Sequence, residues 1–424
     1  MAAPHSLTGS ILVAAVALPG AVFAHPGTLP ASDDLRFDPS DPTTLVIVAT
    51  FGVLIAPDEG ESEVRWICPD ALGYSDRLEP DLEIAADGTM FSTSFSGLVA
   101  SRDGGCSWAP VGGVVSGAHV EDVEIDAAGR VWAAMADVSV SSHIAVSTDG
   151  GRTFTASTPP VEGVLWTEVR AAPGNADRLY AAGRILPSEP RLIRSNDGGA
   201  SWTDLPVESI ETGESGSIRL LAVSPTEPDL VFVRAERGTE DGLYRSADGG
   251  ATWTEVLTMD GSIRALVVRS DGSSVIAGTI YGGVRVSSDG GVTWTEPAQQ
   301  PQMACAHERA DGTLFTCGAN WDPDGFMVGK SPDAMTWQPV LRASGVTAPL
   351  ECPSGTVQER CAGLAWLQLC TDLGLAACRS VDAGPVPGPS VDTADGGCGC
   401  SSSGAMAAAL APIFWRRRAR RRAR

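Results

Sequence analysis

Short stretches in which apolar and polar residues alternate recur through most of the chain, separated by Gly, Pro, Asn, Asp and Ser. One series comprises residues 220–224, 230–234, 242–246 and 252–257, and a similar series runs through residues 266–294. Because successive side chains of a strand point to opposite faces, an alternation of period two indicates β-strands. Each series therefore predicts four short strands joined by tight turns.

An eight-residue motif, SADGGATW at residues 246–253, ends the third strand of a series and begins the fourth. Its Asp can accept backbone N–H groups within a turn, its Gly pair can adopt positive φ, and its Trp can anchor the next strand. The motif recurs at residues 101–108, 147–154, 195–202 and 287–294, with a degenerate copy around residue 333. We therefore interpret the repeated aspartates, spaced 41 to 51 residues apart, as structural turn residues: Asp103, Asp149, Asp197, Asp248, Asp289 and Asp333.

The motif resembles the Asp-box, or BNR, repeat of sialidase-like β-propellers, and the resemblance covers roughly residues 33–343. A repeat of this period is long enough for one four-stranded blade. Residues 35–67 add a unit with the same strand order and a decayed motif, which brings the count to seven. We expect an all-β fold: a seven-bladed β-propeller of four-stranded antiparallel blades over residues 25–345, followed by a small Cys-rich helical appendage over residues 346–380.

Strand order separates the two faces of such a disc. If the first strand of each blade runs from top to bottom, the motif turns lie on the bottom face. The resemblance implies that ligands meet the opposite, top face at the central channel. When the first strands of the units are aligned, Thr167, two arginines and a glutamate occupy equivalent positions at the top of the channel, and nearby loops add aromatic side chains. The predicted ligand-binding residues are therefore Arg219, Arg264, Glu121, Tyr281 and Trp321.

Two arginines on neighbouring blades could bind a carboxylate or a sulfate. The alternative is that these residues are the ordinary polar lining of a solvent-filled channel mouth. Residues 320–325 have the ligand spacing of a calcium loop, but Ser331 stands where a bidentate Glu is needed. The sequence therefore predicts no metal site and no cofactor.

A sialidase-like mechanism needs three arginines around the substrate carboxylate, a Tyr nucleophile activated by Glu, and an acidic proton donor. Sialidases of the kind that this repeat resembles carry an Arg-Ile-Pro motif before the first box, and nothing before Asp103 matches it. The nearest string, residues 184–187, has an insertion and lies two blades later. We therefore favour a non-enzymatic propeller that binds a glycan, a protein or an extracellular polymer, with no catalytic residues assigned; the alternative is a secreted sialidase-like glycoside hydrolase or lyase.

Charge and an N-terminal signal indicate the compartment. The formal net charge of the 424 residues is −22, and seven of the positive charges lie in the last nine residues, so the body is more acidic still. An acidic body argues against nucleic acid and anionic membranes as partners. Residues 1–24 are typical of a secretory signal, which predicts export to an oxidising compartment.

In such a compartment the ten cysteines should be mostly disulfide-bonded. Cys305 and Cys317 flank a predicted hairpin turn symmetrically and would face each other across its ladder. A bridge between neighbouring blades could join Cys68 to Cys106. The remaining cluster, Cys352, Cys361, Cys370 and Cys378, would pin a helical segment at residues 357–379 by two disulfides; a zinc site is the alternative.

The C-terminal tail has three parts. After a Pro/Gly linker at residues 381–397 come Cys398 and Cys400, a short apolar run at residues 405–415, and an Arg cluster. This arrangement resembles the MYXO-CTERM sorting signal, which implies processing near the Cys pair by membrane machinery and display of the protein at the cell surface. The alternative is a basic tail that binds nucleic acid.

Overall fold

The computed structural model describes residues 31–73, 80–159, 161, 163–321 and 324–375. The predicted signal at 1–24, the linker at 381–397, the sorting signal with Cys398 and Cys400, and Cys378 all lie outside the described residues. Within the described ranges, no helix has both the length and the apolar character needed to cross a bilayer.

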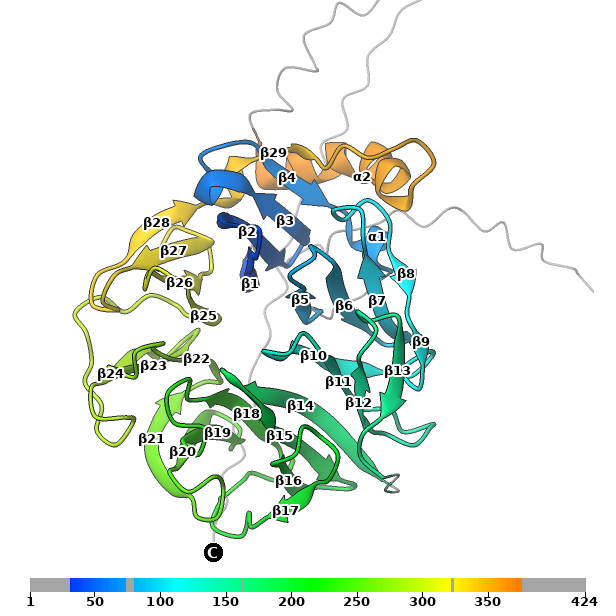
Figure 1. Ribbon diagram of the computed structural model, residues 1–424. Helices are drawn as coiled ribbons and strands as arrows, with labels where there is room; N and C mark the ends of the chain where they lie inside the picture. The colour runs from blue at the N-terminus through cyan, green and yellow to red at the C-terminus, as the bar shows by residue number, and fades with distance from the viewer. Residues whose placement is uncertain (1–30, 74–79, 160, 162, 322–323, 376–424) are drawn as a thin grey trace, which may run out of the picture. The chain divides into compact units, whose positions relative to one another are not determined.

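Seven β-sheets surround a central channel (Figure 1), which confirms the seven-bladed propeller predicted from the repeats. Within each blade the consecutive strands follow one another from the channel outward as an antiparallel meander, and two of the sheets gain a further outer strand. Blades one to three consist of β1 (Ser32–Asp38), β2 (Asp41–Ala49), β3 (Gly52–Ala56) and β4 (Val64–Ile67); β5 (Leu82–Ile84), β6 (Met90–Ser94), β7 (Gly97–Ser101) and β8 (Ala109–Pro110); and β10 (Val120–Ile125), β11 (Val131–Met135), β12 (Ile144–Ser147) and β13 (Thr153–Ala156).

Blades four to seven continue the same order. They consist of β14 (Val164–Ala172), β15 (Asn175–Ile185), β16 (Glu189–Ser195) and β17 (Thr203–Leu205); β18 (Ile218–Val223), β19 (Val231–Glu236), β20 (Glu240–Ser246) and β21 (Thr254–Asp260); β22 (Ile263–Val268), β23 (Val275–Thr279) and β24 (Gly283–Ser287); and β25 (Cys305–Glu308), β26 (Leu314–Cys317), β27 (Val328–Ser331) and β28 (Gln338–Leu341). In the sixth blade a single bridge, Val286 to Thr295, stands in place of a fourth strand.

Hydrophobic clusters fill the spaces between neighbouring blades. One cluster joins Trp132 of β11 to Trp166 and Val169 of β14, all almost fully buried. Both faces of a blade are therefore covered, so its central strands read as continuous apolar runs such as residues 131–135. Burial of this apolar surface between the blades stabilises the ring by about 25 cal/mol per Å².

Each motif turn is closed by its Asp and Ser side chains. In the fifth blade Ser246 Oγ donates to Asp248 Oδ1 at 2.8 Å, and Gly250 N donates to Ser246 Oγ at 2.7 Å. Thr252 donates its backbone N–H to Asp248 Oδ1 at 2.9 Å and its hydroxyl to Oδ2 at 2.6 Å. These bonds, those from Thr252 first, lower the pKa of Asp248 to about 2. The same Asp–Ser pattern recurs at Asp103, Asp149, Asp197, Asp289 and, in weaker form, Asp333.

The motif turns also connect neighbouring blades. The carbonyl of the first motif Gly accepts a hydrogen bond from an arginine of the preceding blade, for example Gly249 from Arg194 at 2.7 Å and Gly290 from Arg245 at 2.7 Å. In the register of the fifth blade, Ser246 pairs with Val231, which pairs with Val223 at the end of β18. The motif turns therefore lie at the end of the innermost strand opposite to Arg219.

The ring is closed by the segment that follows the seventh blade. The short η1 (Pro57–Gly60) and η2 (Ala343–Gly345) helices border this junction, and β29 (Val346–Pro349) pairs in parallel with β4. A second parallel addition, β9 (Gly112–Gly113), pairs with β13. The helix α2 (Val357–Leu373) then contacts α1 (Pro69–Leu72), and the fully buried Gln358 Nε2 donates to Trp66 O at 2.9 Å. The predicted helical segment is thus attached to the first blade.

The disulfides correct one part of the sequence analysis. Cys305 and Cys317 are bonded across the β25–β26 hairpin as predicted, with their Cα atoms 4.9 Å apart. Cys68 and Cys106 do not pair with each other: Cys68 bonds Cys361 and Cys106 bonds Cys352. The reason is β29, which carries the chain back along the first blade and brings both C-terminal cysteines to the first two blades. Cys370 is also disulfide-bonded.

We predict that Asp248→Ala lowers the free energy of unfolding by about 1–2 kcal/mol, because three hydrogen-bond donors of the turn lose their acceptor. Urea unfolding followed by tryptophan fluorescence measures the change. The exposed Asp260 of the same blade provides the control, and Asp260→Ala should leave the unfolding midpoint unchanged. Equal stability of the wild type and Asp248→Ala would show that the turn does not need its carboxylate.

We predict that replacing Cys106 and Cys352 together by Ser lowers the free energy of unfolding by about 2–4 kcal/mol, because this disulfide closes a long loop in the unfolded chain. Thermal unfolding under oxidising conditions measures the loss. Non-reducing peptide mapping checks the pairing itself, and a peptide that joins Cys68 to Cys106 would refute it.

Candidate functional site

The innermost strands of the seven blades surround a cavity of about 600 Å³ in the channel. Its lining is dominated by charged side chains, with eight carboxylates against five guanidinium groups. These are Asp33, Asp34, Asp81, Glu83, Glu121, Asp122, Glu124 and Glu168, and Arg36, Arg170, Arg219, Arg234 and Arg264. Carboxylates therefore outnumber arginines at the surface that a ligand would meet.

β-Bulges explain why so many side chains face the channel. The register of the innermost strands shifts at Glu121 in β10, at Thr167 in β14 and at Arg264 in β22. A bulge places two consecutive residues opposite one, which re-aims side chains and is common beside active sites. Both Glu121 and Asp122 consequently line the cavity.

Arg36 is the centre of one charged cluster in the channel. It donates to Asp34 Oδ2 at 2.6 Å, to Glu83 Oε1 at 2.7 Å and to Asp81 Oδ1 at 3.3 Å. His307 Nε2 lies 2.8 Å from Asp34 Oδ1. Burial opposes ionisation of Asp34, but the charges and hydrogen bonds of Arg36 and His307 outweigh it, so the pKa of Asp34 lies well below its usual range.

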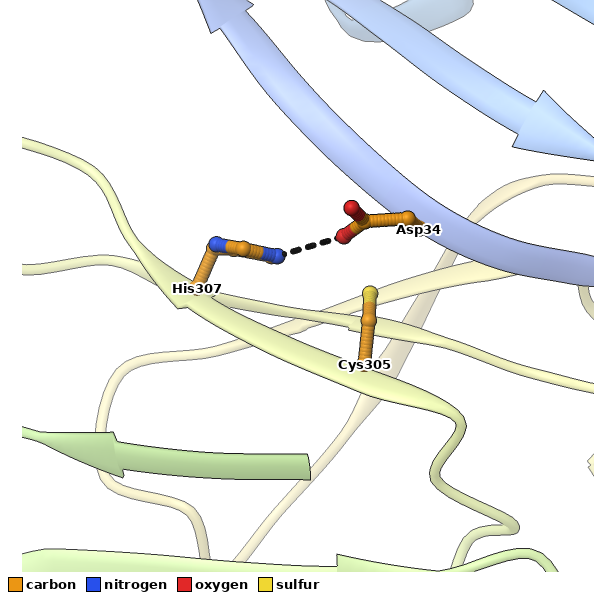
Figure 2. A group of neighbouring side chains, drawn as sticks. All are labelled: Asp34, Cys305 and His307. Atoms are coloured by element: carbon orange, nitrogen blue, oxygen red, sulfur yellow. Dashed lines mark hydrogen bonds and ion pairs between the residues drawn. The ribbon is translucent and has the colours of Figure 1, made fainter. Parts of the chain in front are cut away.

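Figure 2 shows Asp34, His307 and Cys305 facing one another across β1 and β25. These three side chains are close enough together to hold a metal ion. Cys305, however, is oxidised in its disulfide with Cys317 and offers no thiolate. The same holds for a second such group, in which Cys68 and Cys361 are bonded to each other beside Asp70.

Glu124 differs from Asp34 because its partners are weak. Its Oε1 accepts from Ala171 N at 3.4 Å, and its Oε2 lies 3.9 Å from Arg170 Nη1. Arg170 bonds instead to both oxygens of Asp122 at 2.7 Å. Burial, only partly opposed by Arg170, raises the pKa of Glu124 to about 7. Burial therefore favours the protonated form of Glu124, whereas Arg36 and His307 favour the ionised form of Asp34.

Three of the five predicted ligand-binding residues, Glu121, Arg219 and Arg264, line the channel cavity. Arg219 donates to Glu168 Oε1 at 2.5 Å and to Glu121 Oε1 at 3.2 Å, and Arg264 Nη1 lies 3.3 Å from Asp33 Oδ1. Both guanidinium groups therefore already face carboxylates. Their role in binding a ligand stays a prediction.

The two predicted aromatic residues lie elsewhere. Tyr281 stands in the turn between β23 and β24 with 85% of its surface exposed, and it does not line the cavity. Trp321 follows β26 and is half-buried. The neighbouring side chains of the calcium-like loop bind backbone: Asn320 Oδ1 accepts from Ala343 N and Asp324 Oδ2 from Gln302 N, both at 2.9 Å.

Asp34, Glu83 and Glu124 were not predicted from the sequence as site residues. A signal for them exists, because the innermost strands carry charged residues on both sides of one apolar residue, as in Asp122-Val-Glu124 and Glu168-Val-Arg170. Such a pattern points two charges to one face of a strand, here toward the channel. Three of the four residues predicted at the channel, Glu121, Thr167 and Arg264, lie at the bulged positions of their strands.

No protein-family model matches the sequence. A xyloglucanase from a Paenibacillus species is 27% identical over 284 residues, which cover 62% of this chain and 26% of the relative. A xyloglucanase from Hypocrea jecorina is 36% identical over 93 residues, which cover 20% of this chain and 11% of the relative. The chain therefore spans about a quarter, or less, of the length of these relatives.

Among solved structures, hydrazine synthase from Kuenenia stuttgartiensis superposes with a TM-score of 0.53 at 12% identity, covering 73% of this chain and 99% of that chain. This likeness shows the fold alone. The names of the sequence relatives contradict our interpretation of the chain as a non-enzymatic binding protein, because both relatives are named xyloglucanase, a glycoside hydrolase, and neither is named a sialidase. Hydrolysis by two carboxyl groups needs neither a Tyr nucleophile nor an arginine triad, so a chain that lacks the sialidase residues can still be a glycoside hydrolase.

We predict that the stability of the folded protein decreases between about pH 4.5 and 7 in a way that depends on Glu124. The pKa of Glu124 is raised by folding, so the folded state holds a proton that the unfolded chain has released, and this advantage is lost as the pH rises through about 7. Urea unfolding of wild type and Glu124→Gln at pH 5 and pH 8 measures it. The variant should gain stability relative to the wild type at pH 8, whereas the exposed control Asp260→Asn should follow the wild type at both pH values.

Proposed function

We propose that this protein is an exported glycoside hydrolase that acts on a neutral polysaccharide of the β-glucan type, with its active site in the acidic channel. The observation that carries the proposal is that two carboxyl groups lining one cavity have pKa values moved in opposite directions: the pKa of Glu124 is raised and that of Asp34 is lowered. The relatives named xyloglucanase support a glycan substrate and this reaction class.

Glycoside hydrolysis uses one carboxylic acid to protonate the departing oxygen and one carboxylate as base or nucleophile. In this proposal Glu124 gives its proton to the glycosidic oxygen as the bond to the anomeric carbon breaks. Asp34, kept ionised by Arg36 and His307, takes a proton from the attacking water or bonds to the anomeric carbon. A proton donor is most effective when its pKa lies near the working pH, which the burial of Glu124 achieves.

Charge favours a neutral substrate over an acidic one. The carboxylates in the channel outnumber the arginines, and Arg219 is already surrounded by Glu121, Glu168 and Glu236. A sialic or uronic acid would bring a further negative charge into this field. An uncharged sugar, in contrast, can use the carboxylates as hydrogen-bond acceptors for its hydroxyl groups.

The disulfides fit an extracellular protein. We propose in addition that the tail acts as a MYXO-CTERM-type signal, with Cys398 and Cys400 as the processing site, and that it displays the enzyme at the cell surface. We also propose that the motif turns are BNR-type boxes whose function is architectural. Their Asp–Ser hydrogen bonds on the face away from Arg219 support this role.

We predict that Glu124→Gln and Asp34→Asn each lower kcat on tamarind xyloglucan or mixed-linkage β-glucan by at least about 100-fold, because each removes one partner of the acid–base pair. Release of reducing ends measures the rate, and far-UV circular dichroism checks that the variants fold. Wild-type activity should fall as the pH rises above about 7, where Glu124 loses its proton. The exposed Asp260→Asn is the matched control; unchanged rates in both channel variants would rule out this active site.

A further inference from the structure

Asp122 and Glu124 of β10 share one neighbouring arginine. The two carboxyl groups lie two residues apart on the strand, and both line the channel cavity. Arg170 of β14 faces both of them: its Nη1 lies 2.7 Å from each oxygen of Asp122 and 3.9 Å from Glu124 Oε2. One nitrogen atom therefore stands between two acceptors and forms hydrogen bonds with Asp122 alone.

Asp122 has the surroundings of a carboxylate. Its side chain belongs to a residue that is only 4% exposed, and its Oδ2 accepts a further hydrogen bond from Val169 N at 2.8 Å. Burial raises the pKa of Asp122, and the charge of Arg170 opposes that rise. Within the described residues, its hydrogen-bond partners are all donors, whereas a protonated carboxyl would need an acceptor for its own hydrogen. The ionised form, with Arg170 as its counter-ion, fits this site.

The other charges that act on Glu124 already have partners. Glu83 of β5 opposes the ionisation of Glu124, and Arg36 of β1 favours it. Arg36 Nε donates to Glu83 Oε1 at 2.7 Å, and its Nη1 donates to Asp34 Oδ2 at 2.6 Å. The position of Arg170 therefore decides how far the charge of Glu124 is compensated.

We propose that Asp122 is a positioning residue of the proposed active site: it holds Arg170 away from Glu124, so that Glu124 keeps the proton that it gives to the glycosidic oxygen. This inference rests on the proposed function. If Arg170 formed a hydrogen-bonded ion pair with Glu124, the ionised carboxylate would be favoured and the channel would lose its acid. Asp122 needs no contact with the substrate in this role, because it acts through Arg170.

The variant Asp122→Asn tests the proposal and keeps the connection between blades. Its amide oxygen can still accept from Val169 N, whereas its amide NH₂ group would face a donor of Arg170. Arg170 should then pair with Glu124, and an opposite charge this close lowers the pKa of a carboxyl by about 1–3 pH units. We therefore expect the pKa of Glu124 to fall from about 7 by at least about 1 pH unit.

Carbon-13 NMR of protein labelled at the glutamate carboxyl carbon measures this titration, and the resonance of Glu124 is identified by its absence in Glu124→Gln. The matched control is Asp241→Asn. Asp241 is also 4% exposed, accepts from Ile263 N of the next blade at 3.0 Å and bonds Arg234 Nη1 at 2.8 Å. Arg234 pairs in addition with Glu236, so the control variant should leave the titration of Glu124 unchanged.

Two further variants test whether the effect passes through Arg170. In the double variant Asp122→Asn, Arg170→Gln, the fall in the pKa of Glu124 should disappear. Arg170→Gln alone should raise the pKa of Glu124, because burial then acts with less opposition; this variant also serves if Asp122→Asn does not fold.

Hydrolysis of mixed-linkage β-glucan gives a second readout. A merely structural role of Asp122 would lower kcat at every pH. The positioning role instead moves the alkaline limb of the pH profile of Asp122→Asn to lower pH, because the acid is lost at a lower pH, and preserves the rate on the acidic side.

An unchanged Glu124 titration in Asp122→Asn, an equal fall in the double variant, or no rise in Arg170→Gln would overturn the positioning role. If the wild type hydrolyses the glucan while the titration does not respond, the positioning role falls and the proposed function stands. If the titration responds as expected but the wild type hydrolyses no glucan, the control of Glu124 by Asp122 stands and the proposed activity falls.

Discussion

Carboxylates at the channel wall that hydrogen-bond to the innermost strand of the next blade are the interaction on which the rest of the structure depends. Asp81 Oδ2 accepts a hydrogen bond from Val123 N, and Asp122 Oδ2 accepts one from Val169 N, both at 2.8 Å. Glu168 Oε2 accepts a longer one from Leu220 N at 3.5 Å. Each bond ties an innermost strand to the blade before it. A closed ring of sheets leaves these backbone donors facing the channel, and an unpaired buried donor is costly. The carboxylates satisfy the donors but bring buried charge with them.

That buried charge explains the arginines and, through them, the chemistry of the channel. Arg36 and Arg170 compensate the bridging carboxylates, but their donors reach the carboxyl groups unequally. Asp34 receives a short hydrogen bond from Arg36, whereas Glu124 lies 3.9 Å from Arg170 Nη1, the nitrogen that bonds Asp122, and is left with weak partners. Groups of one type in one cavity therefore have pKa values moved in opposite directions. A difference of this kind between the pKa values of two carboxyl groups is the basis for assigning one as the acid and the other as the base in an active site.

The fold could be predicted from the sequence because the patterns that specify its strands and turns are short and recur in each blade. The strands found at Ile218–Val223 and Thr254–Asp260 differ from the predicted ranges by at most three residues, since period-two alternation and the Gly-containing turns act over short distances. The partners of Cys68 and Cys106 could not be predicted, because the return of β29 along β4 is a long-range pairing without a local signal. The site was predicted only in part: the bulges that point Glu121 and Asp122 into the channel together depend on how two strands pair.

One face of the ring carries the motif turns, which stabilise the fold, and the other carries the charged groups of the channel. On the motif face, charged groups have lowered pKa values because they accept several hydrogen bonds, as Asp248 does, so their ionised forms stabilise the turns. On the channel face, ionised Glu124 opposes folding, because its raised pKa reflects burial without adequate partners. A mutation that supplied such partners would stabilise the ring and remove the proton from neutral pH. Burying Glu124 without adequate partners lowers the free energy of unfolding. The ring tolerates this loss because the hydrogen-bonded turns and the apolar packing between blades stabilise it.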